Sequence, residues 1–148
     1  MQKKSILFVC TGNIIRSPVC QGICDKITGG ALRVDSAATS GLHRNEAADD
    51  RAVRIVKKHG IDISQHRART IRLDDWILFD YIVAIDTKVY NTLLKIKPED
   101  SKAKLMLYSS EGIPDPYFCG RSEFDKMYEE IASIMPSFLQ TNNIYTSS

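Results

Sequence analysis

Short apolar runs alternate along the chain with longer stretches in which apolar residues recur at helical spacing. Four short runs have the length and composition of buried strands, at residues 6–9, 33–37, 81–85 and 104–108. The helical spacing predicts helices over residues 17–28, 47–59, 88–97 and 124–138. Strands that alternate with helices are typical of a parallel sheet covered on both faces. The pattern therefore predicts one α/β domain over residues 1–148, with a four-stranded parallel sheet.

Particular residues mark the expected helix ends. Ser17 and Pro18 are typical of a helix start, because serine caps free amides and proline suits the first turn. Gly29 favours the end of the same helix. Pro136 predicts a kink or an end in the last helix. Residues 141–148 are expected to fray.

The composition is that of an ordinary globular protein, with 43 % hydrophobic and 26 % charged residues. The net charge of +2 is too small to indicate a nucleic-acid or membrane partner. The basic stretch 66–72 is read as a solvated face, with acidic or phosphorylated partners as the alternative. No apolar run is long enough to cross a bilayer, and no secretory signal pattern is present. We therefore expect a cytoplasmic protein that is a monomer or weak dimer.

The four cysteines, Cys10, Cys20, Cys24 and Cys119, match neither a zinc-binding spacing nor a disulfide framework. Cys20 and Cys24 lie beside the apolar stripe of the first helix, which favours core packing over redox chemistry. The chain also contains no Walker loop and no dinucleotide-binding glycine pattern. We therefore expect no metal and no other cofactor.

The first apolar run ends in Cys10, and five residues separate this cysteine from Arg16. A loop of that length can close around a tetrahedral anion with its amides pointing inward, while the guanidinium supplies two parallel donors. The helix dipole beyond the loop favours the thiolate form of the cysteine. We predict that the thiolate attacks phosphorus, and the alternative is an inert buried thiol beside a turn. The residues expected to bind the phosphate are Thr11, Gly12, Asn13, Ile14, Ile15 and Arg16.

A thiolate that displaces an oxygen from phosphorus also needs an acid to protonate the departing oxygen. Asp115 lies between Pro114 and Pro116, which stiffen its loop, and beside the aromatic residues Tyr117 and Phe118. We predict that Asp115 protonates the leaving oxygen and then activates water. The alternative is an ordinary Asp-Pro turn.

With both motifs present, the chain resembles the low-molecular-weight protein tyrosine phosphatases from residue 6 to about residue 139. The resemblance implies hydrolysis of phosphotyrosine in proteins, or of small aryl phosphates, through a phosphocysteine intermediate. It assigns Cys10 as nucleophile, Arg16 as phosphate clamp and Asp115 as general acid and then base. The matching stretches are 10–18, 35–41, 59–61, 66–69, 79–86 and 115–117.

The resemblance also implies supporting roles for four residues. Asn13 holds the loop in a strained shape, and Ser17 donates a hydrogen bond to the nucleophilic thiolate. His66 corresponds to the family histidine that hydrogen-bonds this serine, and Asp86 fixes the guanidinium that clamps the phosphate. Without the resemblance, His66 is a surface histidine and Asp86 a helix cap.

Several positions depart from the family pattern. Ile15 stands where many members carry a second cysteine that forms a reversible disulfide with the nucleophile, which leaves Cys20 and Cys119 as candidate partners for oxidised Cys10. Leu42 and His43 stand where an aromatic residue, often tryptophan followed by histidine, usually forms the cleft wall. Phe118 replaces a common tyrosine and keeps a stacking surface beside Tyr117. The predicted cleft walls are therefore Leu42, His43, Tyr117 and Phe118.

Other proteins share parts of the pattern. Arsenate reductases of related fold use the same loop but add a pair of cysteines after the third strand, and residues 80–97 contain none. A phosphocysteine subunit of sugar transport typically lacks this arginine and acid. A non-catalytic phosphopeptide-binding module would keep only the anion loop. The presence of Cys10, Arg16 and Asp115 together favours an enzyme.

Overall fold

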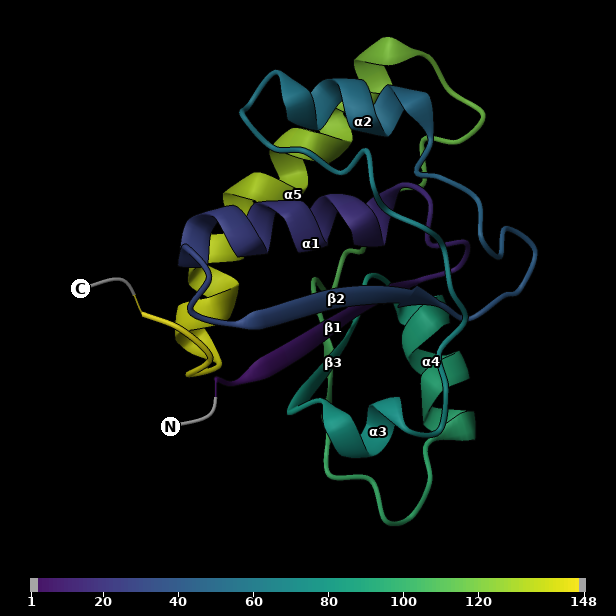
Figure 1. The fold of residues 1–148 in the computed structure, drawn as a ribbon, viewed down its shortest axis with the longest axis vertical. Coiled ribbons are helices and arrows are strands. Elements are labelled where there is room, and N and C mark those ends of the chain that lie inside the picture. Colours follow the sequence, from purple (N-terminus) through teal and green to yellow (C-terminus); the bar gives the residue numbers. More distant parts are fainter. Residues whose placement is uncertain (1–2, 147–148) are drawn as a thin grey trace.

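The computed structural model describes residues 3–146, and its centre is a sheet of four parallel strands in the order β2-β1-β3-β4 (Figure 1). The ends of every strand lie within one residue of the predicted ranges, so the predicted parallel sheet is confirmed. The strands are β1 (Ser5–Cys10), β2 (Arg33–Ala38), β3 (Tyr81–Ala84) and β4 (Lys104–Leu107).

Helices cover both faces of the sheet, as predicted. In Figure 1, α1 and α5 lie on one face with α2 packed outside them, and α3 and α4 lie on the other face. Within residues 3–146, no helix has the length and hydrophobicity that crossing a bilayer requires. The helices are α1 (Arg16–Thr28), α2 (Asp50–Lys57), α3 (Asp75–Leu78), α4 (Thr87–Ile96) and α5 (Arg121–Thr141).

The central strand β1 is buried along its whole length because β2 and β3 flank it and helices cover its two faces. Its apolar residues Ile6, Leu7 and Val9 are fully buried, which explains the continuous apolar run in the sequence. The core also takes up Cys20 and Cys24 of α1, as predicted. Burial raises the pKa of the Cys20 thiol, and it raises the pKa of Cys24 to about 12, so both thiols stay protonated.

The four predicted helices begin one to three residues away from the predicted positions, and two of these differences have a local cause. The helix predicted from Ser17 begins at Arg16, and Ser17 does not cap it because its hydroxyl bonds to groups of the preceding loop. The helix predicted from residue 47 begins at Asp50, because the side chain of Asp49 accepts a hydrogen bond from the amide of Arg51 and so caps α2.

The end of the chain is more ordered than predicted. Pro136 does not end α5, which continues to Thr141, because Phe138 and Leu139 beyond the proline are buried in the core. Ile144 is also buried, and its amide donates to the carbonyl oxygen of Leu139. Ile144 and Tyr145 therefore pack against the domain, and residues 147–148 of the predicted frayed tail lie outside the described residues.

The strand order creates a crevice at the carboxyl edge of the sheet. The chain passes from β1 to β2 on one side and places β3 on the other side, so the loops that follow β1 and β3 diverge. Cys10 ends β1, Asp86 follows β3, and Asp115 lies in the loop after β4. Three distant parts of the sequence thus meet at one edge of the sheet.

Candidate active site

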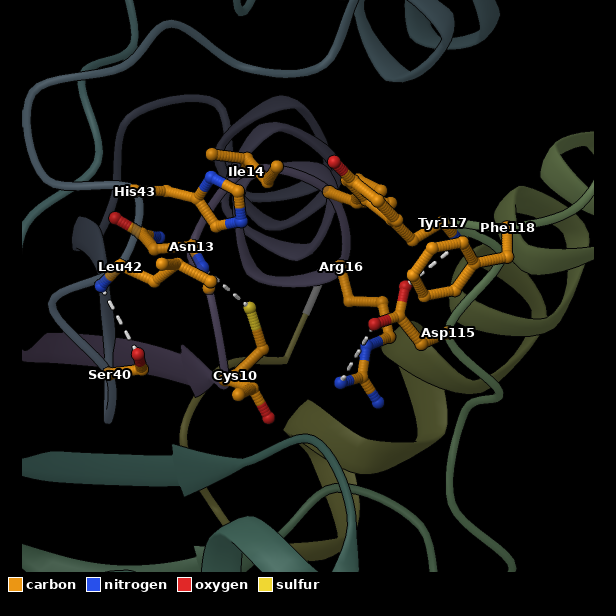
Figure 2. A pocket seen from close by; sticks show the side chains of 13 residues that line it. Cys10, Asn13, Ile14, Arg16, Ser40, Leu42, His43, Asp115, Tyr117 and Phe118 are labelled. Carbon is orange, nitrogen blue, oxygen red and sulfur yellow. Dashed lines mark hydrogen bonds and ion pairs between the residues drawn. The ribbon is translucent and has the colours of Figure 1, made fainter.

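The loop after β1 wraps around the sulfur atom of Cys10 (Figure 2). The amide of Asn13 donates to Cys10 Sγ at 3.2 Å, and Ser17 Oγ lies 2.9 Å from the same atom. Within residues 3–146, the amides of Thr11, Gly12, Ile14 and Ile15 have no protein acceptor. Backbone amides of this kind at a helix N-terminus form a binding site for an anion above the sulfur.

A cavity of about 400 Å³ opens above this loop. Cys10 and the predicted phosphate-binding residues 11–16 line it, and so do Asp115 and all four predicted walls. Ser40 also lines the cavity, and its hydroxyl accepts a hydrogen bond from the amide of Leu42, but the sequence analysis did not single it out. The structure thus brings together residues that are more than one hundred positions apart.

The four wall residues lie on two sides of the cavity. Leu42, with 78 % of its surface exposed, lies on one side, and Phe118, with 95 % exposed, lies on the other (Figure 2). The rings of His43 and Tyr117 approach each other to 6.1 Å between centroids. Gly12 permits the close approach of His43, because a Cβ atom at this position would lie 3.0 Å from the imidazole. The wall therefore combines apolar surface with one imidazole.

The guanidinium of Arg16 is held in place on one edge. Nη1 donates to Asp86 Oδ2 at 2.7 Å and to the carbonyl oxygen of Ile113 at 2.9 Å. Within the described residues, Nε and Nη2 make no hydrogen bond, so one edge of the planar group is left with two parallel donors. Two donors in this arrangement match two oxygens of a phosphate.

Asp86 combines the two interpretations that the sequence allowed. Its Oδ1 accepts from the amide of Val89 and caps α4, while its Oδ2 accepts from Arg16. The cap ties the carboxylate to a helix end, and this fixes the position of the arginine. A single carboxylate therefore acts both as a helix cap and as a partner of the phosphate clamp.

Asp115 lies beside Arg16, where it can reach an anion bound above Cys10 (Figure 2). Its Oδ2 is 3.9 Å from Arg16 Nη2, and its Oδ1 accepts from the amide of Tyr117 at 3.1 Å. The side chain is about half exposed, at 49 %, so protons can exchange with solvent. Arg51 holds the far part of this loop by donating to the carbonyl oxygens of Tyr117 and Cys119.

Asn13 links the loop to the rest of the domain. It has a left-handed backbone conformation with a φ of 60°, and its side chain is fully buried. Its Nδ2 donates to Ser17 Oγ at 2.8 Å and to Ser36 Oγ at 3.0 Å, and its Oδ1 accepts from the amide of Arg69. Because Ser17 Oγ accepts from Asn13, the hydroxyl hydrogen of Ser17 is free to point at the sulfur of Cys10.

We expect Asn13→Ala to lower the free energy of unfolding by about 2–4 kcal/mol, because the amide of Arg69 loses its acceptor and the buried hydroxyls of Ser17 and Ser36 each lose a donor. Urea unfolding followed by circular dichroism measures this change. The matched control is Asn45→Ala, since Asn45 has a similar φ of 68° but is exposed. The control should lower the free energy of unfolding by only about 1 kcal/mol, because alanine is more strained than asparagine in the left-handed conformation. Equal losses in the two variants would contradict the role of the buried hydrogen bonds.

The structure corrects the predicted contact of His66. Its Nε2 lies 2.7 Å from the backbone carbonyl oxygen of Asn13, and the hydroxyl of Ser17 bonds to Cys10 and Asn13 instead. Because a carbonyl oxygen only accepts, Nε2 carries a hydrogen. Burial lowers the pKa of His66, against smaller opposing effects of the Asn13 carbonyl and Asp35. The histidine therefore supports the loop through the backbone and is not the surface residue that the sequence alone favoured.

The lowered pKa of His66 predicts a pH-dependent stability. The unfolded chain binds the proton more readily, so the contribution of this group is full above its ordinary pKa of about 6.5 and is lost as the pH falls below it. We expect the melting temperature of the wild type to fall more between about pH 7 and pH 5 than that of His66→Gln, which keeps an N–H donor. Parallel pH dependences in thermal unfolding would contradict this expectation.

Several residues that support the loop were not among the predicted site residues. Arg69, in the basic stretch read as a solvated face, forms two hydrogen bonds to the fully buried carboxylate of Asp75 and a third to Asp35. Ser36 accepts from Asn13 and donates to Gln21 Oε1 at 2.7 Å. These contacts join segments far apart in the sequence, so a local pattern carries no signal for them.

Comparisons with known proteins match nearly all of the described residues. Residues 5–144 match the family model described as low molecular weight phosphotyrosine protein phosphatase. The proteins of that name from Schizosaccharomyces pombe and Homo sapiens are 33 % and 36 % identical to this chain over 149 and 150 residues. The alignments cover 92 % of this chain and 95 % of the yeast protein, and 93 % of this chain and 94 % of the human protein.

The fold is similar to that of a solved tyrosine phosphatase structure. The product state mimic of a protein tyrosine phosphatase from Entamoeba histolytica superimposes with a TM-score of 0.87 and 26 % identity. The superposition covers 99 % of both chains. The fold of this chain is therefore similar to that of the Entamoeba protein over nearly all of the described residues.

Proposed function

The chain belongs to the low molecular weight phosphotyrosine protein phosphatase family, and we propose that it hydrolyses phosphotyrosine in proteins through a phosphocysteine at Cys10. One observation carries this proposal: Cys10, Arg16 and Asp115 line one cavity, with the sulfur below the anion-binding loop and the acid beside the clamp. Nucleophile, charge stabilisation and proton donor thus have the arrangement that phosphoryl transfer needs.

In the proposed first step, the thiolate of Cys10 attacks phosphorus, an S–P bond forms and the P–O bond to the tyrosine breaks. The loop amides and Arg16 stabilise the phosphate oxygens, and Ser17 donates to the sulfur. Asp115 gives its proton to the leaving oxygen. In the second step, Asp115 takes a proton from water, which attacks phosphorus and breaks the S–P bond. Inorganic phosphate leaves, and the thiolate is regenerated without a metal or other cofactor.

The walls of the cavity support an aryl phosphate as substrate. Leu42 and Phe118 present exposed apolar surface on opposite sides of the cavity, and Tyr117 adds an aromatic ring. A phenyl ring attached to the bound phosphate would contact this surface, whereas the short chain of phosphoserine would not reach it. We propose that this contact favours phosphotyrosine, although no aromatic residue stands at position 42.

Hydrolysis of p-nitrophenyl phosphate, with chelator present and the protein fully reduced, tests the proposed function. We expect metal-independent activity that is highest at mildly acidic pH, and faster turnover of a phosphotyrosine peptide than of the matching phosphoserine peptide. A wild type that binds the phosphotyrosine peptide without turnover would contradict the enzyme and favour the binding module. Arsenate reduction is disfavoured by the lack of cysteines in residues 80–97.

We further propose that residues 1–148 form a single domain that acts in the cytoplasm as a monomer or weak dimer. One continuous hydrophobic core and the family match over residues 5–144 support the single domain. Four free cysteines, of which Cys119 is exposed, fit a reducing compartment. Light scattering over a range of protein concentrations would measure the oligomeric state.

A further inference from the structure

A second cavity, of about 250 Å³, lies between α2 and the beginning of α5. Figure 1 shows these two helices side by side at the edge of the domain. Residues at helical spacing on each helix face the cavity, and Ile55 and Phe124 are its buried residues. The polar residues that line it are Arg51, Arg54, Lys58, Arg121 and Asp125.

Positive charge is concentrated in this cavity, which has four cations against the single carboxylate of Asp125. Among the described residues, only Arg51 of these four cations has a carboxylate within 4.0 Å, which is that of Asp49. Arg54, Lys58 and Arg121 are exposed and form no ion pair there. The chain as a whole has a net charge of only +2, so this excess is local. A concave surface of one charge sign with apolar walls attracts the opposite charge.

Arg51 connects this cavity with the active-site cavity. Its guanidinium lies 4.4 Å from the ring centroid of Phe124 and donates to the carbonyl oxygens of Tyr117 and Cys119. Tyr117 also lines the active-site cavity, and its ring centroid lies 5.9 Å from the same guanidinium. A chain segment that leaves the active site over this loop would therefore reach the basic cavity directly.

We propose that the basic cavity is an anion-binding subsite for an acidic or phosphorylated segment of the protein substrate whose phosphotyrosine occupies the active site. This proposal rests on the proposed phosphatase function. An extended peptide advances about 3.3 Å per residue, so acidic residues three to five positions from the phosphotyrosine sample distances of about 10–17 Å from it, and the test peptide carries them there. The concave shape and the shared loop favour a peptide over a flat anionic surface such as a membrane.

The test compares two phosphotyrosine peptides of equal length, one with acidic residues three to five positions on both sides of the phosphotyrosine and one with the matching amides. The variant is Arg54→Gln combined with Arg121→Gln, because both residues are exposed and neither lines the active-site cavity. The matched control, Lys95→Gln with Lys102→Gln, removes the same charge from exposed positions outside both cavities. Turnover of p-nitrophenyl phosphate is measured for every protein.

We expect the wild type and the control to prefer the acidic peptide about tenfold in kcat/KM at low salt, and the preference to fall below about threefold in the Arg54 and Arg121 variant. Activity on p-nitrophenyl phosphate should be equal in all three. An unchanged preference in the variant, or an equal loss in the control, would overturn the subsite. Binding of the three proteins to phosphatidylserine vesicles is measured as well. Vesicle binding that the Arg54 and Arg121 variant loses, while its peptide preference stays unchanged, would indicate a membrane surface and would also overturn the subsite.

Failure of the proposed function is distinguishable from failure of the subsite. A wild type without activity on p-nitrophenyl phosphate overturns the phosphatase proposal. Calorimetric titration of the two peptides into the same proteins then measures the subsite alone. Preferential binding of the acidic peptide that the Arg54 and Arg121 variant loses supports the subsite, and equal binding of both peptides overturns it.

Discussion

Replacement of Cys10 by serine is expected to lower kcat by at least about 10⁴-fold for every phosphate ester tested, while binding of a phosphotyrosine peptide persists. The hydroxyl has nearly the size of the thiol, so the loop around it keeps its amides and the clamp of Arg16. The serine hydroxyl, however, is a far weaker nucleophile toward phosphorus than a thiolate. Stopped assays with p-nitrophenyl phosphate measure turnover, and calorimetric titration measures peptide binding.

Cys119→Ser is the matched control for this variant. Cys119 is exposed at the end of the loop that carries Asp115, and its hydrogen bond from Arg51 is to the backbone carbonyl oxygen. We expect activity within about twofold of the wild type, since its thiol takes part in no proposed step. Residual activity above about 1 % in Cys10→Ser would contradict the nucleophile, provided that mass spectrometry excludes carry-over of wild-type protein. Acid quenching of the wild type should also trap a phosphate on Cys10.

The parts of the structure that the sequence predicted well are those that depend on neighbours in the chain. The apolar run of β1 is continuous because both faces of the strand are covered, so its position could be predicted to within one residue. The loop from Cys10 to Arg16 is also local, because the chain between these two residues forms the anion site. Burial of Cys20 and Cys24 followed from the periodicity of α1.

Contacts between distant segments could not be predicted in the same way. Ser17 has the residue type of a helix cap, but its hydroxyl bonds to Asn13 and Cys10, so it does not cap the helix. His66 bonds to the backbone of Asn13, and a carbonyl oxygen has no signature in the sequence. Pro136 favours a helix end by its local chemistry, but the burial of residues beyond it continues α5.

The position of Asp115 shows how the fold combines local and distant effects. The prolines on either side and the hydrogen bond from the amide of Tyr117 shape its turn locally. Arg51, from α2, then holds the carbonyl oxygens of Tyr117 and Cys119, and Arg16 holds the carbonyl oxygen of Ile113 before the turn. The loop is therefore anchored on both sides of Asp115. Anchors of this kind keep a general acid within reach of the leaving oxygen.

Removal of this acid should have an effect that depends on the leaving group. We expect Asp115→Ala to lower kcat by about 10²–10³-fold for phenyl phosphate, whose leaving oxygen is strongly basic and needs a proton. The loss should be smaller for p-nitrophenyl phosphate, because the nitrophenolate leaves more readily without one. Asp115→Asn should show the same losses as Asp115→Ala, although its side-chain oxygen can still accept the hydrogen bond from the amide of Tyr117. This variant therefore separates lost acidity from lost loop structure.

The control for the acid is Glu111→Gln, which removes an exposed carboxylate from the same connection between β4 and α5. It should leave both rates within about twofold of the wild type. Rates measured against leaving-group basicity are the decisive measurement, because a general acid flattens this dependence and its removal steepens it. Equal losses across the series would mean that Asp115 holds the loop or binds substrate without transferring a proton, and the proposed acid would then have to be another residue of the cavity.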